Sequence, residues 1–439
     1  MMAFPAPRCW LGAVLVTSAL GAGAYPIDGY EHTGIGRLEA QRRIEAGMLE
    51  GRSQPAGAHL PLSDVDVRLA DAKAMALPGQ DPALSSQLSA LLQEMFGAEA
   101  ANYGVALLDL SRPDAPRYGE HQGELRQNPG SVGKLLVAVA IFQALADLYP
   151  EDVPARLRIL REGRVTADEF ILTDSHRVGI WDRDSERLIR RPLALGDTGS
   201  LFEFLDWMIS PSSNAAAAMC TKHAVLLRHF GREYPVGADR ARAFIEHTPP
   251  PALGELLATT LQSPVTRNGL DVSKLRQGSL FTRSGKRLLP GTTSYATPRA
   301  LVRLMWRMER GLLVDRFSSM ELKRLMYVTE RRIRYASSPA LRDAAVYFKS
   351  GSLYRCRPEP GYRCLKYRGN ALNLLNSIAI VEAPAAARRL HYVVAVMSNV
   401  KYRNSAVDHQ TLATRIHRLV ERHHAETPPS AAPAPVPPP

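Results

Sequence analysis

Cysteine is scarce in this chain, with 4 residues among 439, and neither the cysteines nor the 12 histidines follow the spacing of metal ligands. We therefore expect no metal and no cofactor. The histidines of the basic C-terminal stretch, His417, His423 and His424, are expected to be solvated.

Aromatic residues make up only 7% of the chain, and they do not alternate with basic residues in patches. No nucleic-acid-binding motif is present either, so we expect no nucleic acid partner despite a formal net charge of +12. The positive charge indicates attraction to anionic polymers or carboxylate-bearing substrates. The alternative is that arginines are spread over the surface without a specific partner.

Long apolar runs are also few, and the clearest one, Trp10 to Ala24, lies at the N-terminus. Arg8 precedes the run, which ends in the cleavage signal Ala22-Gly23-Ala24 and is too short for a membrane span. We predict a signal peptide over residues 1–24 and export across the inner membrane to the periplasm. No membrane span is expected after cleavage.

Export permits a disulfide, and two cysteines are placed to form one. Cys356 and Cys364 flank a seven-residue stretch that can close on itself. Cys220 lies among alanines in a helix-like run, where we expect a buried structural thiol.

The first motif that indicates chemistry is Ser131-Val132-Gly133-Lys134. It follows the turn residues Asn128-Pro129-Gly130 and precedes the apolar run Leu135 to Leu145, so it opens a buried helix. A helix N-terminus favours developing negative charge, and Lys134 projects from the same face as Ser131 one turn later. A desolvated lysine can take the proton of a serine and make it a nucleophile. The alternative is a helix-capping serine with a snorkelling lysine.

Ser398-Asn399-Val400-Lys401 matches the same pattern. It follows a strand-like run, His391 to Met397, and opens no buried helix, so its context does not fit. We therefore assign Ser131 as the nucleophile and Lys134 as the base.

The second motif, Ser212-Ser213-Asn214, is the only S-x-N in the chain and leads into the helix-like run Ala215 to Phe230. It is also a good helix N-cap signal. The functional interpretation places Ser212 as a proton relay to a leaving nitrogen. Asn214 would then hold the substrate amide.

The third motif, Lys349-Ser350-Gly351, lies in a β-rich run from Ala345 to Tyr354. A glycine there lets a ligand approach the backbone. Lys349 and Ser350 would bind a substrate carboxylate, and the N–H groups of Ser352 and Ser131 would form an oxyanion hole.

In this order the three motifs resemble the signature of the class A β-lactamase and penicillin-binding serine D,D-peptidase superfamily. The resemblance extends to the helix opening at Thr297 to Leu301 and to the strands Asn376 to Val381 and Tyr392 to Met397. It implies an α/β (α+β) fold, with an antiparallel five-stranded sheet flanked by helices and an inserted helical lobe. Tyr103 to Leu110 reads as an early strand of that sheet, and a last helix follows Asp408 as its cap.

These patterns divide the chain into four parts. An N-terminal extension of unassigned role spans 25–84, after the signal peptide, and a disordered proline- and alanine-rich tail spans 426–439. The hydrolase domain spans 85–425. Its helical lobe covers about 131–340, and its sheet lobe covers 85–130 and 341–425.

The resemblance implies an exported serine acyl-hydrolase that opens β-lactam amides through an acyl-enzyme on Ser131. The alternatives are a D,D-peptidase acting on D-alanyl peptides, an esterase of the same fold, and a non-catalytic module that binds the cell wall. Ser131, Lys134 and Ser212 would be catalytic, and the substrate-binding residues would be Asn214, Lys349, Ser350, Gly351 and Ser352.

Two features depart from the family pattern. No Glu-x-x-Leu-Asn motif follows the second motif, and Glu233, Glu246 and Glu255 fall in that region without Leu-Asn at the right offset. Glu255 is the least implausible substitute as a deacylating base. The second departure is the long excursion from Arg355 to Leu372, where family members turn tightly, and we expect it to reshape the substrate cleft.

Overall fold

The structure is a computed structural model that describes residues 29–70 and 76–425. The predicted signal peptide and the predicted tail lie outside the described residues. The helices are α1 (Gly29–Thr33), α2 (Gly36–Glu45), α3 (Pro82–Phe96), α4 (Lys134–Leu148), α5 (Val153–Glu162), α6 (Leu201–Ile209), α7 (Asn214–Phe230), α8 (Ala238–His247), α9 (Pro250–Arg267), α10 (Arg283–Leu288), α11 (Pro298–Glu309), α12 (Arg316–Tyr327) and α13 (Ser405–Ala425). The strands are β1 (Tyr103–Asp109), β2 (Arg117–His121), β3 (Arg164–Thr166), β4 (Arg177–Asp182), β5 (Arg187–Pro192), β6 (Thr198–Ser200), β7 (Leu275–Arg276), β8 (Tyr295–Ala296), β9 (Ala345–Arg355), β10 (Leu372–Ala383) and β11 (Leu390–Asn399).

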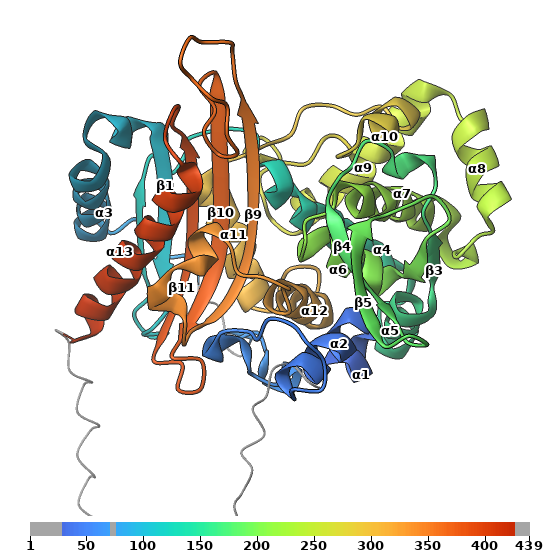
Figure 1. The fold of residues 1–439 in the computed structure, drawn as a ribbon, viewed down its shortest axis with the longest axis horizontal. Helices are drawn as coiled ribbons and strands as arrows, with labels where there is room; N and C mark the ends of the chain where they lie inside the picture. Colours follow the sequence, from blue (N-terminus) through green and yellow to red (C-terminus); the bar gives the residue numbers. More distant parts are fainter. Residues whose placement is uncertain (1–28, 71–75, 426–439) are drawn as a thin grey trace, which may run out of the picture.

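Five antiparallel strands form the main sheet, in the order β2-β1-β11-β10-β9 (Figure 1). The first long strand pairs with the last, with Val105 opposite Val396, and Gly351 of β9 lies opposite Asn376 of β10. The predicted antiparallel five-stranded sheet, flanked by helices, is confirmed. β9 forms one edge of this sheet and faces the helical lobe (Figure 1).

Both faces of the sheet are covered, which explains why its inner strands are nearly continuous apolar runs. On one face, Val105, Val394 and Val396 pack in a core with residues of α3 and α13 such as Leu88 and Ile416. Figure 1 shows these two helices together on the side of the sheet away from the helical lobe. Alternate residues of the same strands point to the opposite face and join the larger core of the helical lobe.

The helical lobe is built around α4, whose residues are almost all buried. By length and composition, the stretch Gly130–Leu148 is apolar enough to cross a membrane, but α4 packs against α7 and α9 in the protein core. The lobe also contains the hairpin of β4 and β5, which the sequence analysis did not predict. α11, which is capped by Thr297 as expected, packs against β1 and β11.

Two expectations for the last helix are wrong. α13 begins at Ser405, so Asp408 lies in its first turn and is not the cap; its carboxylate accepts hydrogen bonds from Tyr103 and Arg403 instead. His417 is buried and hydrogen bonded to the hydroxyl of Tyr392, because it lies on the face of α13 that packs on the sheet.

The N-terminal segment 29–70 packs against both lobes. Arg37 of α2 is buried and forms an ion pair with the buried Asp206 of α6, with Nε 2.6 Å from Oδ2. Farther along, Gly57 donates its N–H to the carbonyl of Arg342, just before β9. A Cβ at Gly57 would lie 2.0 Å from the carbonyl oxygen of Ala344, so this contact needs glycine. The segment therefore ties the helix that precedes Ser212 to the strand that carries Lys349.

Candidate active site

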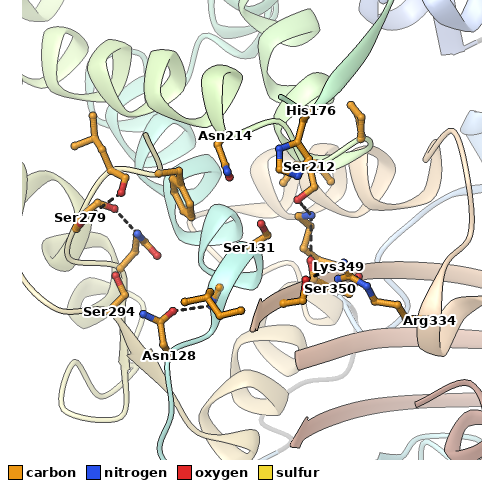
Figure 2. Close-up of a pocket in the computed structure, with 18 of the residues that line it drawn as sticks. Asn128, Ser131, His176, Ser212, Asn214, Ser279, Ser294, Arg334, Lys349 and Ser350 are labelled. Carbon is orange, nitrogen blue, oxygen red and sulfur yellow. Dashed lines mark hydrogen bonds between the residues drawn. The ribbon is translucent and has the colours of Figure 1, made fainter. Parts of the chain in front are cut away.

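The three motifs meet at one cavity of about 670 Å³ between β9 and the helical lobe (Figure 2). Its wall includes the predicted residues Ser131, Ser212, Asn214, Lys349, Ser350 and Ser352. Lys134 lies buried behind the wall, and Gly351 packs against the backbone at Ser131. Ser398, which we excluded, does not line the cavity; it is buried on β11 and hydrogen bonded to His409.

Ser131 lies in the 3-10 turn η4 (Gly130–Gly133), which runs directly into α4. The turn is set by local chemistry: Gly130 has a φ of +55° and donates its N–H to the side chain of Asn128 at 2.8 Å. Val132 and Gly133 are buried, whereas Ser131 is half-buried and lies at the centre of the cavity in Figure 2. The helix start predicted at Ser131 is thus a tighter turn that presents the serine to the cavity.

Lys134 is fully buried, and its ammonium has three oxygen partners. Nζ donates to the carbonyl of Ser212 at 2.6 Å, to the side-chain oxygen of Asn214 at 2.8 Å and to the hydroxyl of Ser212 at 3.3 Å. Burial lowers the pKa of Lys134 to about 7, against a smaller opposing effect of Asp174. No hydrogen bond joins Lys134 to Ser131 among the residues described. Near neutral pH a substantial fraction of Lys134 is therefore unprotonated and able to accept a proton.

Ser212 connects the two lysines of the site. Its hydroxyl oxygen accepts from Lys349 Nζ at 2.8 Å and from Lys134 Nζ at 3.3 Å (Figure 2 shows Ser212 above Lys349). Both lone pairs are then used, so the hydroxyl proton is available to the cavity. Ser212 has a φ of +65°, a conformation that is rare for serine. The structure holds this residue in an unfavourable conformation where both lysines reach it.

The middle residue of the motif has the capping role that we considered as the alternative. Ser213 is the N-cap of α7, and its hydroxyl accepts from the N–H of Ala216 at 3.1 Å. The same hydroxyl donates to Asp174 at 2.9 Å. The capping and functional interpretations therefore apply to different residues of one tripeptide.

Lys349 is buried in β9, next to a cation that the sequence analysis did not find. Burial lowers the pKa of Lys349 well below its ordinary value, with further contributions from Lys134 and Arg334. Arg334 begins the 3-10 turn η7 (Arg334–Ser337) and donates to the hydroxyls of Ser350 at 2.9 Å and Ser352 at 3.2 Å. Arg334 belongs to the run Arg331-Arg332-Ile333-Arg334 in a chain rich in arginine, so no local signal distinguished it.

Gly351 is the point of closest approach between β9 and η4. A Cβ at Gly351 would lie 2.4 Å from the amide nitrogen of Ser131 and 2.5 Å from the carbonyl oxygen of Pro129. On the other side, a Cβ at Gly130 would lie 3.3 Å from the amide nitrogen of Ser352. The N–H groups of Ser131 and Ser352 thus belong to two backbone segments in direct contact. The oxyanion hole assigned to them stays a prediction.

Cys356 and Cys364 form a disulfide in the long loop between β9 and β10, as predicted, and Cys220 is a buried free thiol. The loop contributes Lys366 and Tyr367 to the cavity wall. Tyr367 accepts a hydrogen bond from Arg334 at 3.0 Å. Burial raises the pKa of Tyr367, but Arg334 and Lys366 outweigh burial and lower it overall. The excursion therefore shapes the cavity, as expected.

The charges around the cavity are of one sign. Lys286, Arg334, Lys349 and Lys366 line it together with His176, and no carboxylate among the described residues does so. Glu255 is exposed on α9 and does not line the cavity. Glu233 and Glu246 are also exposed and do not line it either. The substitute for a deacylating glutamate that we considered least implausible is thus wrongly placed.

The fold and the cavity define a β-lactamase-like protein. The profile of the beta-lactamase enzyme family (Beta-lactamase2) matches residues 157–422, more than half of the chain. The chain belongs to the beta-lactamase enzyme family. The matched range includes Ser212 and Lys349 but begins after Ser131, so the placement of the nucleophile rests on the motif and on the geometry.

Several solved structures are similar to this one. An acyl-enzyme complex of PBP-A with penicillin G has a TM-score of 0.49 and 16% identity, covering 79% of this chain and 100% of that chain. The TLA-3 extended-spectrum beta-lactamase has a TM-score of 0.49 and 14% identity, covering 76% and 99%. A beta-lactamase from Sphaerobacter thermophilus has a TM-score of 0.47 and 15% identity, covering 77% and 96%. No curated protein sequence matches the chain.

Proposed function

We propose that this protein is an exported serine acyl-hydrolase that opens β-lactam amides through an acyl-enzyme on Ser131. The observation that carries the proposal is the hydroxyl of Ser212, which accepts from Lys349 at 2.8 Å and from Lys134 at 3.3 Å at the wall of the cavity that Ser131 lines. Such a bridge is a proton path of the kind that acyl transfer to a serine needs.

In the acylation step, the neutral amine of Lys134 takes the proton of Ser131, and Oγ attacks the amide carbonyl carbon. The N–H groups of Ser131 and Ser352 stabilise the oxyanion. When the tetrahedral intermediate collapses, the C–N bond breaks and Ser212 donates its proton to the leaving nitrogen. Ser212 then regains a proton from Lys134, which restores the starting state of both groups.

Substrate binding rests on the cationic side of the cavity. Arg334 donates to the hydroxyl of Ser350 at 2.9 Å, and Lys349 precedes Ser350 in β9. These three residues would bind a carboxylate, while Asn214 would hold the amide next to the reacting carbonyl. Gly351 does not make room for the substrate as predicted, because the space beside its Cα holds the backbone at Ser131.

A D,D-peptidase acting on D-alanyl peptides of the cell wall is the second candidate, because one observation favours it. No carboxylate among the described residues lines the cavity, so the group that activates water in a fast β-lactamase is not supplied by an acidic side chain there. Acylation would use the same residues, and the acyl-enzyme would be long-lived.

Intact mass after mixing the mature protein with penicillin tests the proposal. We expect a one-to-one adduct in the wild type and in Ser398→Ala, and none in Ser131→Ala. An adduct that forms and clears indicates a β-lactamase, whereas a lasting adduct indicates the D,D-peptidase. If no adduct forms at any time, the proposal fails, and the esterase and wall-binding alternatives replace it.

The disulfide and the N-terminal sequence together support export. We expect the mature protein to begin at Tyr25 when it is expressed with its full N-terminus in a bacterium with two membranes. The N-terminal sequence of the periplasmic fraction checks this. Full-length protein confined to the cytoplasm would contradict the assignment.

A further inference from the structure

An aspartate–histidine pair lies at the wall of the cavity, and the sequence analysis singled out neither residue. Nδ1 of His176 is 2.6 Å from Oδ1 of Asp174. His176 lines the cavity and its side chain is 42% exposed, whereas the carboxylate of Asp174 is 4% exposed. In Figure 2, His176 lies next to Ser212 on the wall above Lys349.

Asp174 is fixed by the same turn that carries the second motif. Its Oδ2 accepts from the hydroxyl of Ser213 at 2.9 Å and from the N–H of Ala215 at 2.9 Å. Burial raises the pKa of Asp174, but hydrogen bonds from His176, Ala215 and Ser213 outweigh burial and hold it well below its ordinary value. Asp174 is therefore an ionised carboxylate with a set orientation.

This carboxylate determines how the imidazole is used. An ionised Asp174 accepts the proton of Nδ1–H, so in the neutral imidazole Nε2 of His176 is the hydrogen-bond acceptor. Among the residues that the structure describes, Nε2 has no hydrogen-bond partner. The arrangement has the form of a general base whose tautomer and orientation are fixed by a buried acid.

No other group at the cavity is as well placed to act as a general base on an acyl-enzyme. Lys134 donates to Ser212 and Asn214, and Ser212 accepts from both lysines. No carboxylate of the described chain lines the cavity. Lys134, the base of acylation, lies buried behind the wall, so the imidazole of His176 is the base that lines the cavity itself.

We propose that His176 is the catalytic base that activates water to hydrolyse the acyl-enzyme, with Asp174 as its positioning residue. This inference rests on the proposed function. A water molecule gives one proton to Nε2 of His176 while its oxygen forms a bond with the ester carbonyl carbon. The tetrahedral oxyanion collapses, the bond from carbon to Ser131 Oγ breaks, and Oγ recovers the proton from the imidazolium. The products are the free serine and a carboxylic acid that ionises to solvent.

The test separates formation of the adduct from its decay. Wild type and His176→Gln are acylated with penicillin, excess drug is removed, and intact mass is followed over time. We expect His176→Gln to form the adduct at a rate within about threefold of wild type and to lose it at least about 100-fold more slowly, the range for loss of a general base. His247→Gln, an exposed histidine on α8, is the matched control and should decay at the wild-type rate.

Asp174→Asn should slow decay more than formation, and the double variant should decay no more slowly than His176→Gln alone, because the two residues act as a unit. Disruption of the Ser212 turn would slow formation and decay together.

Three results would overturn the inference while leaving the proposed function in place. The first is an adduct of His176→Gln that decays at the wild-type rate. The second is a His176→Gln variant that forms the adduct more slowly but does not lose it more slowly. The third is a wild-type adduct that does not decay. If the wild type forms no adduct, the proposed function itself fails.

Discussion

The contact between Gly351 and the turn at Ser131 allows a prediction with a magnitude. In Gly351→Ala, the new Cβ would lie 2.4 Å from the amide nitrogen of Ser131, and ordinary contacts begin at 3.4 Å. The atoms that it meets are backbone atoms of Pro129, Ser131 and Val132, which cannot rotate away. β9 and η4 must therefore separate by about 1 Å, a misplacement that can cost about 100-fold in rate.

We expect Gly351→Ala to lower the acylation rate by about 100-fold and the free energy of unfolding by about 1–3 kcal/mol, the usual cost of overpacking. Labelling with a fluorescent penicillin measures the first quantity, and urea unfolding measures the second. Gly237→Ala is the control, because Gly237 has a φ of −60° and no atom lies within 4 Å of the added Cβ. Acylation of Gly351→Ala within about threefold of the wild-type rate would refute the argument that this contact sets the site.

Three further predictions concern charged side chains. The acylation rate should rise with pH up to about 7 and then level off, because only the neutral form of Lys134, with a pKa of about 7, accepts the proton of the serine. An acylation rate that falls as pH rises to 7 would contradict this prediction. Arg37→Ala should lower the free energy of unfolding, measured in urea, by about 3–5 kcal/mol, since it leaves buried Asp206 without its partner. The control Arg240→Ala removes an exposed ion pair and should cost under about 1 kcal/mol; equal losses in the two variants would refute the prediction that the buried pair matters more. Arg334→Ala should weaken acylation by carboxylate-bearing penicillins by about 10- to 100-fold and affect their methyl esters much less; an equal loss for acids and esters would rule out carboxylate binding.

The sequence predicted the parts of the site that local patterns encode. Ser131 follows a proline–glycine turn and precedes an apolar helix, Ser212 precedes a helix cap, and Lys349 lies in a β-rich run. The residues around each motif therefore predict its secondary structure. The order of the three motifs then implied the fold, and the sheet follows from strands that are apolar on both faces.

The residues that the sequence did not reveal are polar side chains in a loop and in a short 3-10 turn. Arg334, Asp174 and His176 take their roles from partners in other segments, such as Ser350 for Arg334 and Ser213 for Asp174. Such contacts depend on how lobes pack and leave no periodic signal. The hairpin of β4 and β5 was missed because both strands are short and lack a clear alternation, and because β5 is largely exposed and rich in arginine.

The strand order also has a consequence for the timing of folding. β1 pairs with β11, and Val105 meets Val396 about 290 residues later in the chain. At a synthesis rate of about 5–20 residues per second, β1 waits roughly 15–60 s for this partner to be made. During that interval its apolar edge is open to wrong partners. The edge of β1 that pairs with β11 therefore stays unpaired until the last strand of the sheet has been made.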